Sequence, residues 1–405
     1  ALDAALNVMR CPAILIAAPA SGQGKTTVAA GLARLLVRRG WRVRAFKCGP
    51  DFIDGGWLEQ ASGAPVHNLD LWMTGEADAR MRLHQAAGSA DVILIEGVMG
   101  LHDGTPSSAA LARRFGVPVL AVVQAAAMAQ TLGAVVQGLR DYGAERDGAL
   151  PWAGVLANGV GGAGHAELLR VALRPGDDWL GHIPRDDALR VPERHLGLAL
   201  ASDALPGEVL VRLDAVADRL QATPLGQLSL ADWRARWSVD FPAPPVPEPL
   251  PTPLARDAAF AFIYAANLET LRALGARLVF FSPLAGDALP ACDALWLPGG
   301  YPELHAARLA ERTDLRAQLQ AHAQAGRPIW AEGGGMLALL DELVDAGGAR
   351  HALWGLLPGR ARIEQRLVGL GLQQWQVAPG ASPLRGHAFH RGAVETPLAA
   401  VAHTA

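Results

Sequence analysis

The sequence has few cysteines, few charged residues and few aromatic residues for its length. Its 405 residues include three cysteines, 19% charged residues and 6% aromatic residues, and the net charge is −3. Cys11, Cys48 and Cys292 do not have the spacing of metal ligands, so we expect neither a disulfide framework nor a zinc site. No run rich in Lys and Arg is present, which argues against a nucleic-acid partner.

Long apolar runs are missing as well. No stretch reaches the roughly 18–20 apolar residues that a membrane span needs. Residues 1–10 lack the basic-then-apolar form of a signal peptide. We therefore expect a cytoplasmic protein with no membrane partner. What is abundant is hydrophobic content, at 51%, and glycine, with 45 residues. This composition and length favour two or three compact domains.

Residues 18–27, with the sequence Ala-Pro-Ala-Ser-Gly-Gln-Gly-Lys-Thr-Thr, form a candidate phosphate-binding loop. The apolar run at residues 13–18 predicts a buried strand before it, and the periodicity of residues 27–39 predicts a helix after it. In this context backbone N–H groups and the helix N-terminus bind phosphate. Pro19 stands where the usual pattern has glycine, so the loop is a variant. We expect it to bind a nucleoside triphosphate.

The loop supplies five predicted nucleotide-binding residues, namely Gly22, Gly24, Lys25, Thr26 and Thr27. The two glycines let the backbone approach the phosphates closely. Lys25 would reach the β- and γ-phosphates, and the hydroxyl of Thr26 would bind Mg²⁺. We therefore predict ATP and Mg²⁺ as ligands of this loop.

Further apolar runs alternate with helical stretches, which predicts a parallel sheet covered on both faces. The runs cover residues 41–46, 91–96, 117–123 and 154–158. In such sheets ligands bind at the carboxyl ends of the strands. The phosphate loop and several charged side chains fall at these ends: Lys47, Asp51, Asp54, Glu96 and Asp103.

Each of these charged residues has more than one interpretation. Asp51 and Asp54 either shape a Gly-Pro-Asp turn or meet Mg²⁺ or substrate beside the γ-phosphate. Glu96 ends an apolar strand, where a carboxylate is unfavourable without a partner, and a metal is the partner that we expect. Asp103 is a loop residue or a substrate contact, and Lys47 is a phosphate clamp or a surface lysine. Together they suit transfer of a phosphoryl group to an oxygen nucleophile.

A proline-rich stretch at residues 241–256 predicts a stiff linker between two domains, residues 1–240 and 257–405. Beyond it, four more apolar runs predict a second, smaller parallel α/β unit. They cover residues 259–264, 277–281, 294–297 and 328–331.

Several of these motifs, taken in order, resemble the cobyrinic (or hydrogenobyrinic) acid a,c-diamide synthases. They lie at residues 18–27, 47–54, 68–73, 95–104, 297–303, 329–335 and 385–390. The resemblance covers nearly the whole chain. It implies an N-terminal domain that resembles dethiobiotin synthetase and uses ATP to convert tetrapyrrole carboxylates to acyl phosphates. It also implies a C-terminal domain similar to class I glutamine amidotransferases, which supplies ammonia.

The resemblance also suggests roles for individual residues. By position, Lys25 and Thr26 would bind phosphate and Mg²⁺, and Glu96 would bind the metal. The three aspartates, Asp51, Asp54 and Asp103, would position the substrate or assist attack by ammonia. Family members further suggest a homodimer.

The chain departs from the family pattern at Gly333, where the family has its nucleophilic Cys. Glycine has no side chain, so acyl transfer by a thiolate cannot occur there, and we expect an inactive glutaminase. The late strand that carries the family's catalytic His is expected beyond Ala405, so the domain is predicted to be truncated. Gly299 and Gly300 form either an oxyanion hole or only a tight turn.

Two histidines remain near the end of the chain, His387 and His390. They match an earlier family segment rather than the catalytic His, so we expect them to be structural or substrate-side residues.

Two functions stay open for the whole chain. The chain is an amide-forming ligase that takes ammonia not made by its own glutaminase site, or a trimmed or substituted form of a glutamine-dependent enzyme. Alternatively, it is a non-amidating, nucleotide-dependent tetrapyrrole-binding or partner protein. The sequence does not identify the tetrapyrrole.

Overall fold

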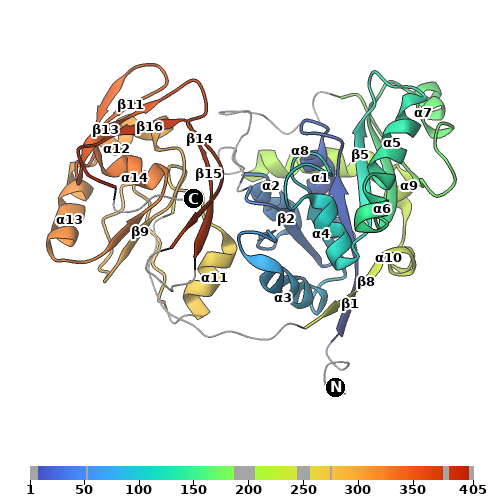
Figure 1. The fold of residues 1–405 in the computed structure, drawn as a ribbon, viewed down its shortest axis with the longest axis horizontal. Helices are drawn as coiled ribbons and strands as arrows, with labels where there is room; N and C mark the ends of the chain where they lie inside the picture. Colours follow the sequence, from blue (N-terminus) through green and yellow to red (C-terminus); the bar gives the residue numbers. More distant parts are fainter. Residues whose placement is uncertain are drawn as a thin grey trace. The chain divides into compact units, whose positions relative to one another are not determined.

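The computed structural model describes residues 8–51, 53–186, 206–243, 256–273, 276–376 and 383–400. The chain divides into two compact units, Ala1–Pro245 and Val246–Ala405, and each is described by itself (Figure 1). Within the described ranges, no helix combines the length and the apolar character needed to cross a membrane.

A largely parallel sheet forms the centre of the first unit. Its strands are β1 (Val8–Ala17), β2 (Val43–Cys48), β3 (His67–Leu69), β4 (Val92–Glu96), β5 (Val119–Gln124), β6 (Trp152–Val160), β7 (Trp179–Pro184) and β8 (Ser238–Pro242). Seven strands are parallel in the order β3-β2-β4-β1-β5-β6-β7, while β8 pairs antiparallel with the first half of β1. The predicted parallel sheet is therefore confirmed, and β3, β7 and β8 are additions to it.

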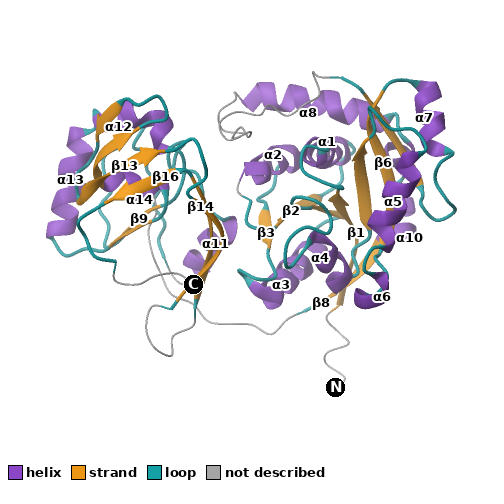
Figure 2. Cartoon of the chain, turned by 45° about the horizontal axis from the view of Figure 1, so that its top comes forward, coloured by secondary structure: helices purple, strands orange, loops and turns teal. Residues whose placement is uncertain are grey.

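Helices cover both faces of this sheet (Figure 2). They are α1 (Lys25–Arg38), α2 (Ile53–Ser62), α3 (Gly75–Ala87), α4 (Ser108–Phe115), α5 (Thr131–Asp141), α6 (Ala144–Asp147), α7 (Ala163–Arg170), α8 (Pro206–Gln221), α9 (Pro224–Gln227) and α10 (Leu230–Trp237). Side chains of α1, α2, α8 and α10 share one core with the strands, and those of α3, α4, α5 and α7 share the other.

Burial on both faces explains why the strands are almost continuously apolar. In β1, Leu15 belongs to the core beneath α3, α4 and α5, while its neighbours Ile14 and Ile16 belong to the core beneath α1 and α8. Successive side chains of a strand point to opposite faces, so the buried part of β1, residues 11–17, contains only apolar residues.

Helix α1, which begins at the phosphate loop, packs closely against α8. A Cβ on Gly31 would lie 2.2 Å from Cγ1 of Val216, so glycine is needed at this contact. The Arg34 guanidinium donates to Oδ1 of Asp214 at 2.7 Å beside it. Both contacts fix the helix that presents the loop.

Strand β8 corrects the predicted linker at its first residues. Phe241 and Pro242 pair with Met9 and Val8 of β1. Proline is tolerated here because β8 is an edge strand, which pairs with β1 and with no other strand in the described part of the chain. Residues 244–255 of the predicted linker lie outside the described residues.

The described residues of the second unit form three smaller sheets. Its strands are β9 (Leu295–Leu297), β10 (Ile329–Ala331), β11 (Leu340–Val344), β12 (Arg350–Ala352), β13 (Leu357–Ile363), β14 (Gly369–Trp375), β15 (Leu384–His390) and β16 (Gly392–Glu395). Its helices are α11 (Ala265–Ala273), η4 (Pro302–His305), α12 (Ala306–Ala310), α13 (Thr313–Gln324) and α14 (Gly334–Leu339). Pairs β9/β10 and β11/β13 are parallel, while β11/β12, β13/β16 and β14/β15 are antiparallel.

Two of the four strands predicted for this unit exist, and two predictions are wrong. Residues 294–297 and 328–331 contain β9 and β10. Residues 259–264 form only isolated bridges, including one between Phe262 and Gly299, and residues 277–281 form no strand. Phe260 is fully buried near Trp354, so its apolar character reflects the core rather than a ladder. Apolar periodicity alone cannot separate these cases.

Candidate functional site

The phosphate loop lies between the end of β1 and the start of α1, as predicted. Gly22 and Gly24 have φ angles of 75° and 91°, in the left-handed region that favours glycine. A Cβ on Gly24 would lie 2.4 Å from Nδ2 of Asn158, whereas Gly22 has open space. Gly24 is thus needed for both its backbone conformation and a close contact.

A polar latch, which the sequence analysis missed, holds this loop to the sheet. The side-chain amide of Asn158 donates to the carbonyl of Gln23 at 3.0 Å. The backbone N–H of Gln124 donates to Oε1 of Gln23 at 2.9 Å. Asn158 and Gln124 lie in β6 and β5, more than a hundred residues from the loop, so no local pattern signals the contact. Their position near the carboxyl ends of apolar strands is the only available hint.

The loop residues predicted to bind phosphate line the first turn of α1. Lys25 is 8% exposed, and its ammonium donates to the carbonyl of Ala20 at 3.2 Å. Burial, followed by the positive charge of Lys47, lowers the Lys25 pKa. The Thr26 hydroxyl donates to Oε1 of Glu96 at 2.6 Å, which joins the loop to the end of β4. Thr27 follows, half-buried.

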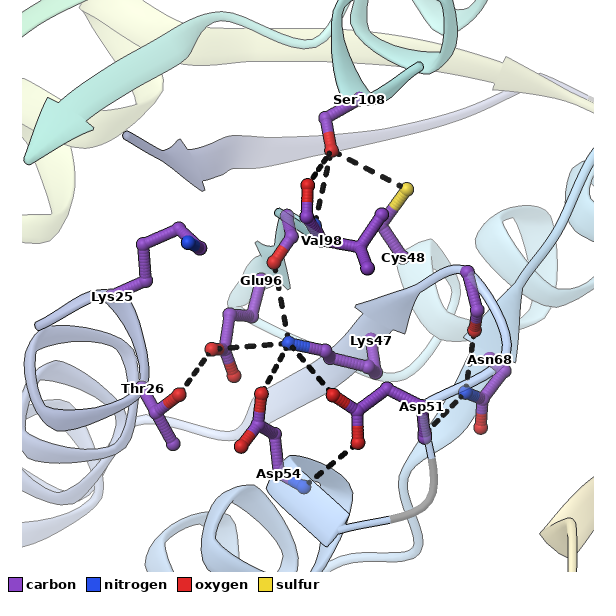
Figure 3. Close-up of polar contacts among 12 residues, drawn as sticks. Lys25, Thr26, Lys47, Cys48, Asp51, Asp54, Asn68, Glu96, Val98 and Ser108 are labelled. Carbon is purple, nitrogen blue, oxygen red and sulfur yellow. Dashed lines mark hydrogen bonds and ion pairs between the residues drawn. The ribbon is translucent and has the colours of Figure 1, made fainter. Parts of the chain in front are cut away.

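Lys47 is the centre of a buried charge network (Figure 3). Its ammonium lies 2.6 Å from Oδ2 of Asp54 and 3.2 Å from Oε1 of Glu96. It lies 3.8 Å from Oδ2 of Asp51 and donates to the carbonyl of Gly97 at 3.2 Å. Lys47 is only 1% exposed. The interpretation of Lys47 as a surface lysine is therefore wrong.

The network sets the ionisation of its members. Burial raises the pKa of Glu96 to about 7, although the Lys47 charge opposes the shift. Burial also acts to raise the pKa of Asp54, but the charge and hydrogen bond of Lys47 outweigh it, so the Asp54 pKa lies below its usual value. Lys47 behaves in the opposite sense. Burial acts to lower its pKa, but the three carboxylates hold the pKa above the ordinary lysine value.

Asp51 takes part in both the turn and the network. Its Oδ1 accepts from the backbone N–H of Asp54 at 3.2 Å, at the start of α2. Its carbonyl accepts from the side chain of Asn68 at 2.8 Å, which fixes the turn. The second carboxylate oxygen faces Lys47. Asp51 therefore shapes the turn, and its contact with Mg²⁺ or substrate stays a prediction.

Asp103 has a local hydrogen bond of its own. It lies in the loop after β4, where its Oδ2 accepts from the backbone N–H of Gly100 at 2.8 Å. Its charge reaches Lys25 closely enough to raise the Lys25 pKa slightly against the lowering by burial. Asp103 therefore shapes a loop at the same edge of the sheet as the phosphate loop.

The predicted metal ligands suit a metal that arrives with a nucleotide. Within the described residues, no three His, Cys, Asp or Glu side chains are arranged to hold a metal ion. However, Mg²⁺ typically needs only one or two carboxylates, because phosphate oxygens and water complete its shell. Oε2 of Glu96 is buried and has no hydrogen-bond partner among the residues that the structure describes, and the Thr26 hydroxyl lies against the other oxygen. This donor pair fits Mg²⁺.

The second unit contains a sharp turn between β10 and α14. Gly333, at this turn, has φ 46° and ψ −113°. A strand, a strained turn and a helix form the arrangement that exposes a nucleophile in enzymes with a nucleophile elbow. Within the described residues, a Cβ on Gly333 would meet only Cα of Gly299, at 3.8 Å. The turn has the geometry for a nucleophile and the space for one, but no side chain.

The neighbouring glycines allow the turn to pack closely. A Cβ on Gly335 would lie 2.1 Å from the carbonyl of Leu297, and one on Gly334 would lie 2.7 Å from the carbonyl of Gly300. Gly299 borders the open position beside Gly333, and its own carbonyl accepts from Phe262. The backbone of Gly300 packs instead against Ala259 and Gly334.

The remaining candidates lie away from this turn. Cys292 precedes β9, at the opposite end of the parallel pair, and its sulfur lies 3.8 Å from Nδ1 of His322. Burial raises the pKa of the Cys292 thiol, which disfavours the thiolate. His390 bonds to the carbonyl of Gly392 through Nδ1, and its ring packs over Gly369. His387 lies on the same strand, β15.

The fold and these two sites define a protein that joins a phosphate-loop nucleotide-binding unit to a glutamine amidotransferase-like unit. Residues 14–198 match the model of the CobQ/CobB/MinD/ParA nucleotide binding domain. Residues 253–404 match the model of the CobB/CobQ-like glutamine amidotransferase domain. The predicted α/β fold class is confirmed for both units.

Relatives define the family more narrowly. A hydrogenobyrinate a,c-diamide synthase of Pseudomonas aeruginosa is 54% identical over 398 residues, which cover 95% of this chain and 87% of the relative. A cobyrinate a,c-diamide synthase of Herminiimonas arsenicoxydans is 46% identical, with 96% and 87% covered. A hydrogenobyrinate a,c-diamide synthase of Rhodobacter capsulatus is 40% identical, with 97% and 93% covered. The chain belongs to the family of cobyrinate and hydrogenobyrinate a,c-diamide synthases, as the sequence motifs predicted.

Proposed function

We propose that this protein is an ATP-dependent carbon–nitrogen ligase of cobalamin biosynthesis. It would amidate the a and c carboxylates of cobyrinic or hydrogenobyrinic acid through acyl phosphates. The observation that most supports this proposal is that the predicted phosphate- and metal-binding residues of the first unit are all present and lie together. Lys25, Thr26 and Glu96 meet at the carboxyl edge of one sheet, and Lys47 joins Glu96 to two further carboxylates.

The first step is phosphoryl transfer. ATP would bind with its phosphates on the loop from Gly22 to Thr27, and Lys25 would leave the carbonyl of Ala20 to reach the γ-phosphate. Thr26 and Glu96 would hold Mg²⁺, which neutralises phosphate charge when it is bound. A carboxylate oxygen of the tetrapyrrole attacks the γ-phosphorus and ADP leaves, while Lys25 and Lys47 stabilise the negative charge that shifts between these oxygens.

The second step is amide formation. Ammonia attacks the acyl carbon, the bond to the phosphate oxygen breaks, and inorganic phosphate leaves. One proton of the attacking nitrogen has to be removed. Asp51, Asp54 and Asp103 are the carboxylates at this edge that would orient the substrate arm or accept this proton. The lowered pKa of Asp54 keeps this carboxylate ionised and able to orient ammonia.

The nitrogen would be free ammonia, or ammonia made by another subunit. Gly333 has no side chain, so its turn cannot form the thioester that glutamine hydrolysis by a cysteine requires. The second unit would then keep the amidotransferase-like fold without its glutaminase reaction.

Mass spectrometry of the tetrapyrrole tests the proposal. Cobyrinic or hydrogenobyrinic acid is incubated with the protein and Mg²⁺·ATP, with either an ammonium salt or glutamine. We expect amidation with ammonium and none with glutamine alone. Amidation with glutamine alone would show that another residue replaces the missing nucleophile. No mass change in either reaction would contradict the ligase proposal and favour a nucleotide-dependent tetrapyrrole-binding protein.

A further inference from the structure

The loop after β4, residues 97–104, is held between two neighbouring loops of the site. On one side, Lys47 donates to the carbonyl of Gly97 at 3.2 Å. On the other side, the N–H of Leu101 donates to the carbonyl of Ala18 at 2.8 Å, and a Cβ on Gly100 would lie 2.6 Å from the carbonyl of Pro19. The loop therefore borders both the charge network and the phosphate loop.

The backbone of Met99, in the middle of this loop, is strained. Its φ angle is 50°, and Asp178 is the only other residue besides glycine with a positive φ in the described part of the chain. Left-handed backbone is unfavourable for a side chain such as methionine. It persists here because both neighbours are fixed. The N–H of Val98 donates to the Ser108 hydroxyl at 3.1 Å, and that of Gly100 to Asp103.

The strained backbone displays an apolar side chain at the edge of the site. Met99 is 46% exposed, whereas the side chain of Val98 lies close to Gly49. The methyl group of Met99 lies 3.3 Å from where a Cβ on Gly104 would be, so the side chain lies along its own loop. It contributes little to either core. Backbone strain at a residue that does not contribute to core packing is typical of functional positions.

We propose that Met99 is a substrate-binding residue whose side chain packs against an apolar face of the tetrapyrrole macrocycle. This inference rests on the proposed function. A corrin-type ring has broad apolar faces surrounded by carboxylate arms. An arm that reaches the γ-phosphate leaves the ring beside the phosphate loop, and the loop that carries Met99 contacts the phosphate loop through Gly100 and Leu101. A thioether is flexible and polarisable, and it packs well on conjugated rings.

Three variants separate substrate binding from backbone strain. Met99→Gly removes both the side chain and the strain, Met99→Gln keeps the strain but makes the side chain polar, and Met99→Leu keeps it apolar. Equilibrium dialysis measures the Kd for hydrogenobyrinic and cobyrinic acid, and steady-state kinetics measures KM for ATP. Thermal unfolding measures Tm.

For Met99→Gly we expect Tm to rise by roughly 2 °C, because glycine relieves the strain. The same variant should weaken tetrapyrrole binding about 3- to 10-fold, through loss of apolar contact. Met99→Gln should weaken binding by a similar factor without raising Tm, and Met99→Leu should stay within about twofold of wild type. KM for ATP should not change in any of them.

Asp178→Gly is the matched control. Asp178 has φ 48° and precedes β7, at the amino end of a strand and therefore at the sheet edge opposite the phosphate loop. Its replacement should not alter tetrapyrrole binding. The inference is overturned if wild type binds a tetrapyrrole and Met99→Gly and Met99→Gln bind it equally well. If wild type binds ATP but neither tetrapyrrole, the proposed function fails, and the inference fails with it.

Discussion

The two candidate sites of this protein differ in how their functional positions are tied to the fold. In the first unit, Lys47 is fully buried and forms ion pairs with Asp54 and Glu96. Removing the Lys47 charge would leave the carboxylates of Asp54 and Glu96 without their common partner. In the second unit, Gly333 faces open space, and among the described residues a Cβ there would meet only Gly299. A side chain at this position can be lost while the turn around it stays intact.

This difference shows why catalytic chemistry and fold can separate. Where a reactive side chain also neutralises buried charge, stability maintains it. Where a reactive side chain projects from a turn that is formed by backbone and small residues, the fold does not depend on that side chain, and only the activity maintains it. The buried charge network around Lys47 illustrates the first case, and the turn at Gly333 illustrates the second.

The sharpest test of the comparison is Lys47→Met. Loss of the buried ammonium leaves Asp54 and Glu96 without their common partner, so the free energy of unfolding should fall by about 3–5 kcal/mol. Urea unfolding measures this change, and product formation with ammonium should be lost as well. In Lys47→Met/Glu96→Gln part of the stability should return while activity stays absent. Unchanged stability in Lys47→Met would show that the network is not structural.

Lys25→Ala should separate activity from stability within the first unit. Among the described residues Lys25 makes one hydrogen bond, to Ala20, so its loss should change Tm by only about 1–2 °C. Turnover should fall by about 10²- to 10³-fold or more, because the charge that stabilises the transferring phosphoryl group is lost. Amidation is measured with ammonium as the nitrogen source. Wild-type turnover in this variant would exclude Lys25 from the reaction.

Gly333→Cys should be tolerated, because the position has room for a side chain. The positive φ at this position should lower stability by about 1–3 kcal/mol. The new thiol should react with iodoacetamide faster than the buried Cys11 and Cys48, which peptide mass spectrometry detects. Gly335→Cys is the control. Its Cβ would lie 2.1 Å from the carbonyl of Leu297, so this variant should unfold at a clearly lower temperature. Equal behaviour of the two variants would contradict the described turn.

The smallest effect is expected for Asp103→Asn. The amide oxygen of asparagine can still accept from Gly100, so stability should stay within about 0.5 kcal/mol of wild type. The negative charge is lost, and kcat should fall about tenfold if Asp103 orients the substrate arm or ammonia. Steady-state kinetics and urea unfolding distinguish the two contributions. Full activity would leave Asp103 with its loop role alone.

The sequence predicted that the phosphate loop and the charged side chains lie at one edge of the sheet, because these parts follow strands of one parallel sheet. The apolar runs before Lys47 and Glu96 were recognisable, and strand ends in such a sheet meet at one edge. What it did not reveal was that Lys47 is buried, since burial depends on the packing of β2 between β3 and β4. The latch between Gln23 and Asn158 was also missed, because uncharged side chains so far apart in sequence carry no periodic signal.

The second unit was predicted less well for a related reason. Its strands are short, and its core includes segments such as that around Phe260 that are buried without forming a ladder. The apolar residues of such segments indicate burial and do not indicate a strand. By contrast, the absence of a nucleophile at Gly333 needed no structure, because one missing side chain is read directly from the sequence.

The pairing of β8 with β1 has a consequence for the order of folding. β1 is the central strand of its sheet, and its first half pairs with the last strand of the first unit. During synthesis, residues 8–12 leave the ribosome long before residues 238–242 are made, so the growing chain carries an unpaired strand segment at the end of β1 opposite its future nucleotide site. Pairing this segment joins the two ends of the unit, which is a slow, non-local step. The first unit therefore completes its sheet only when the ribosome reaches the junction with the second.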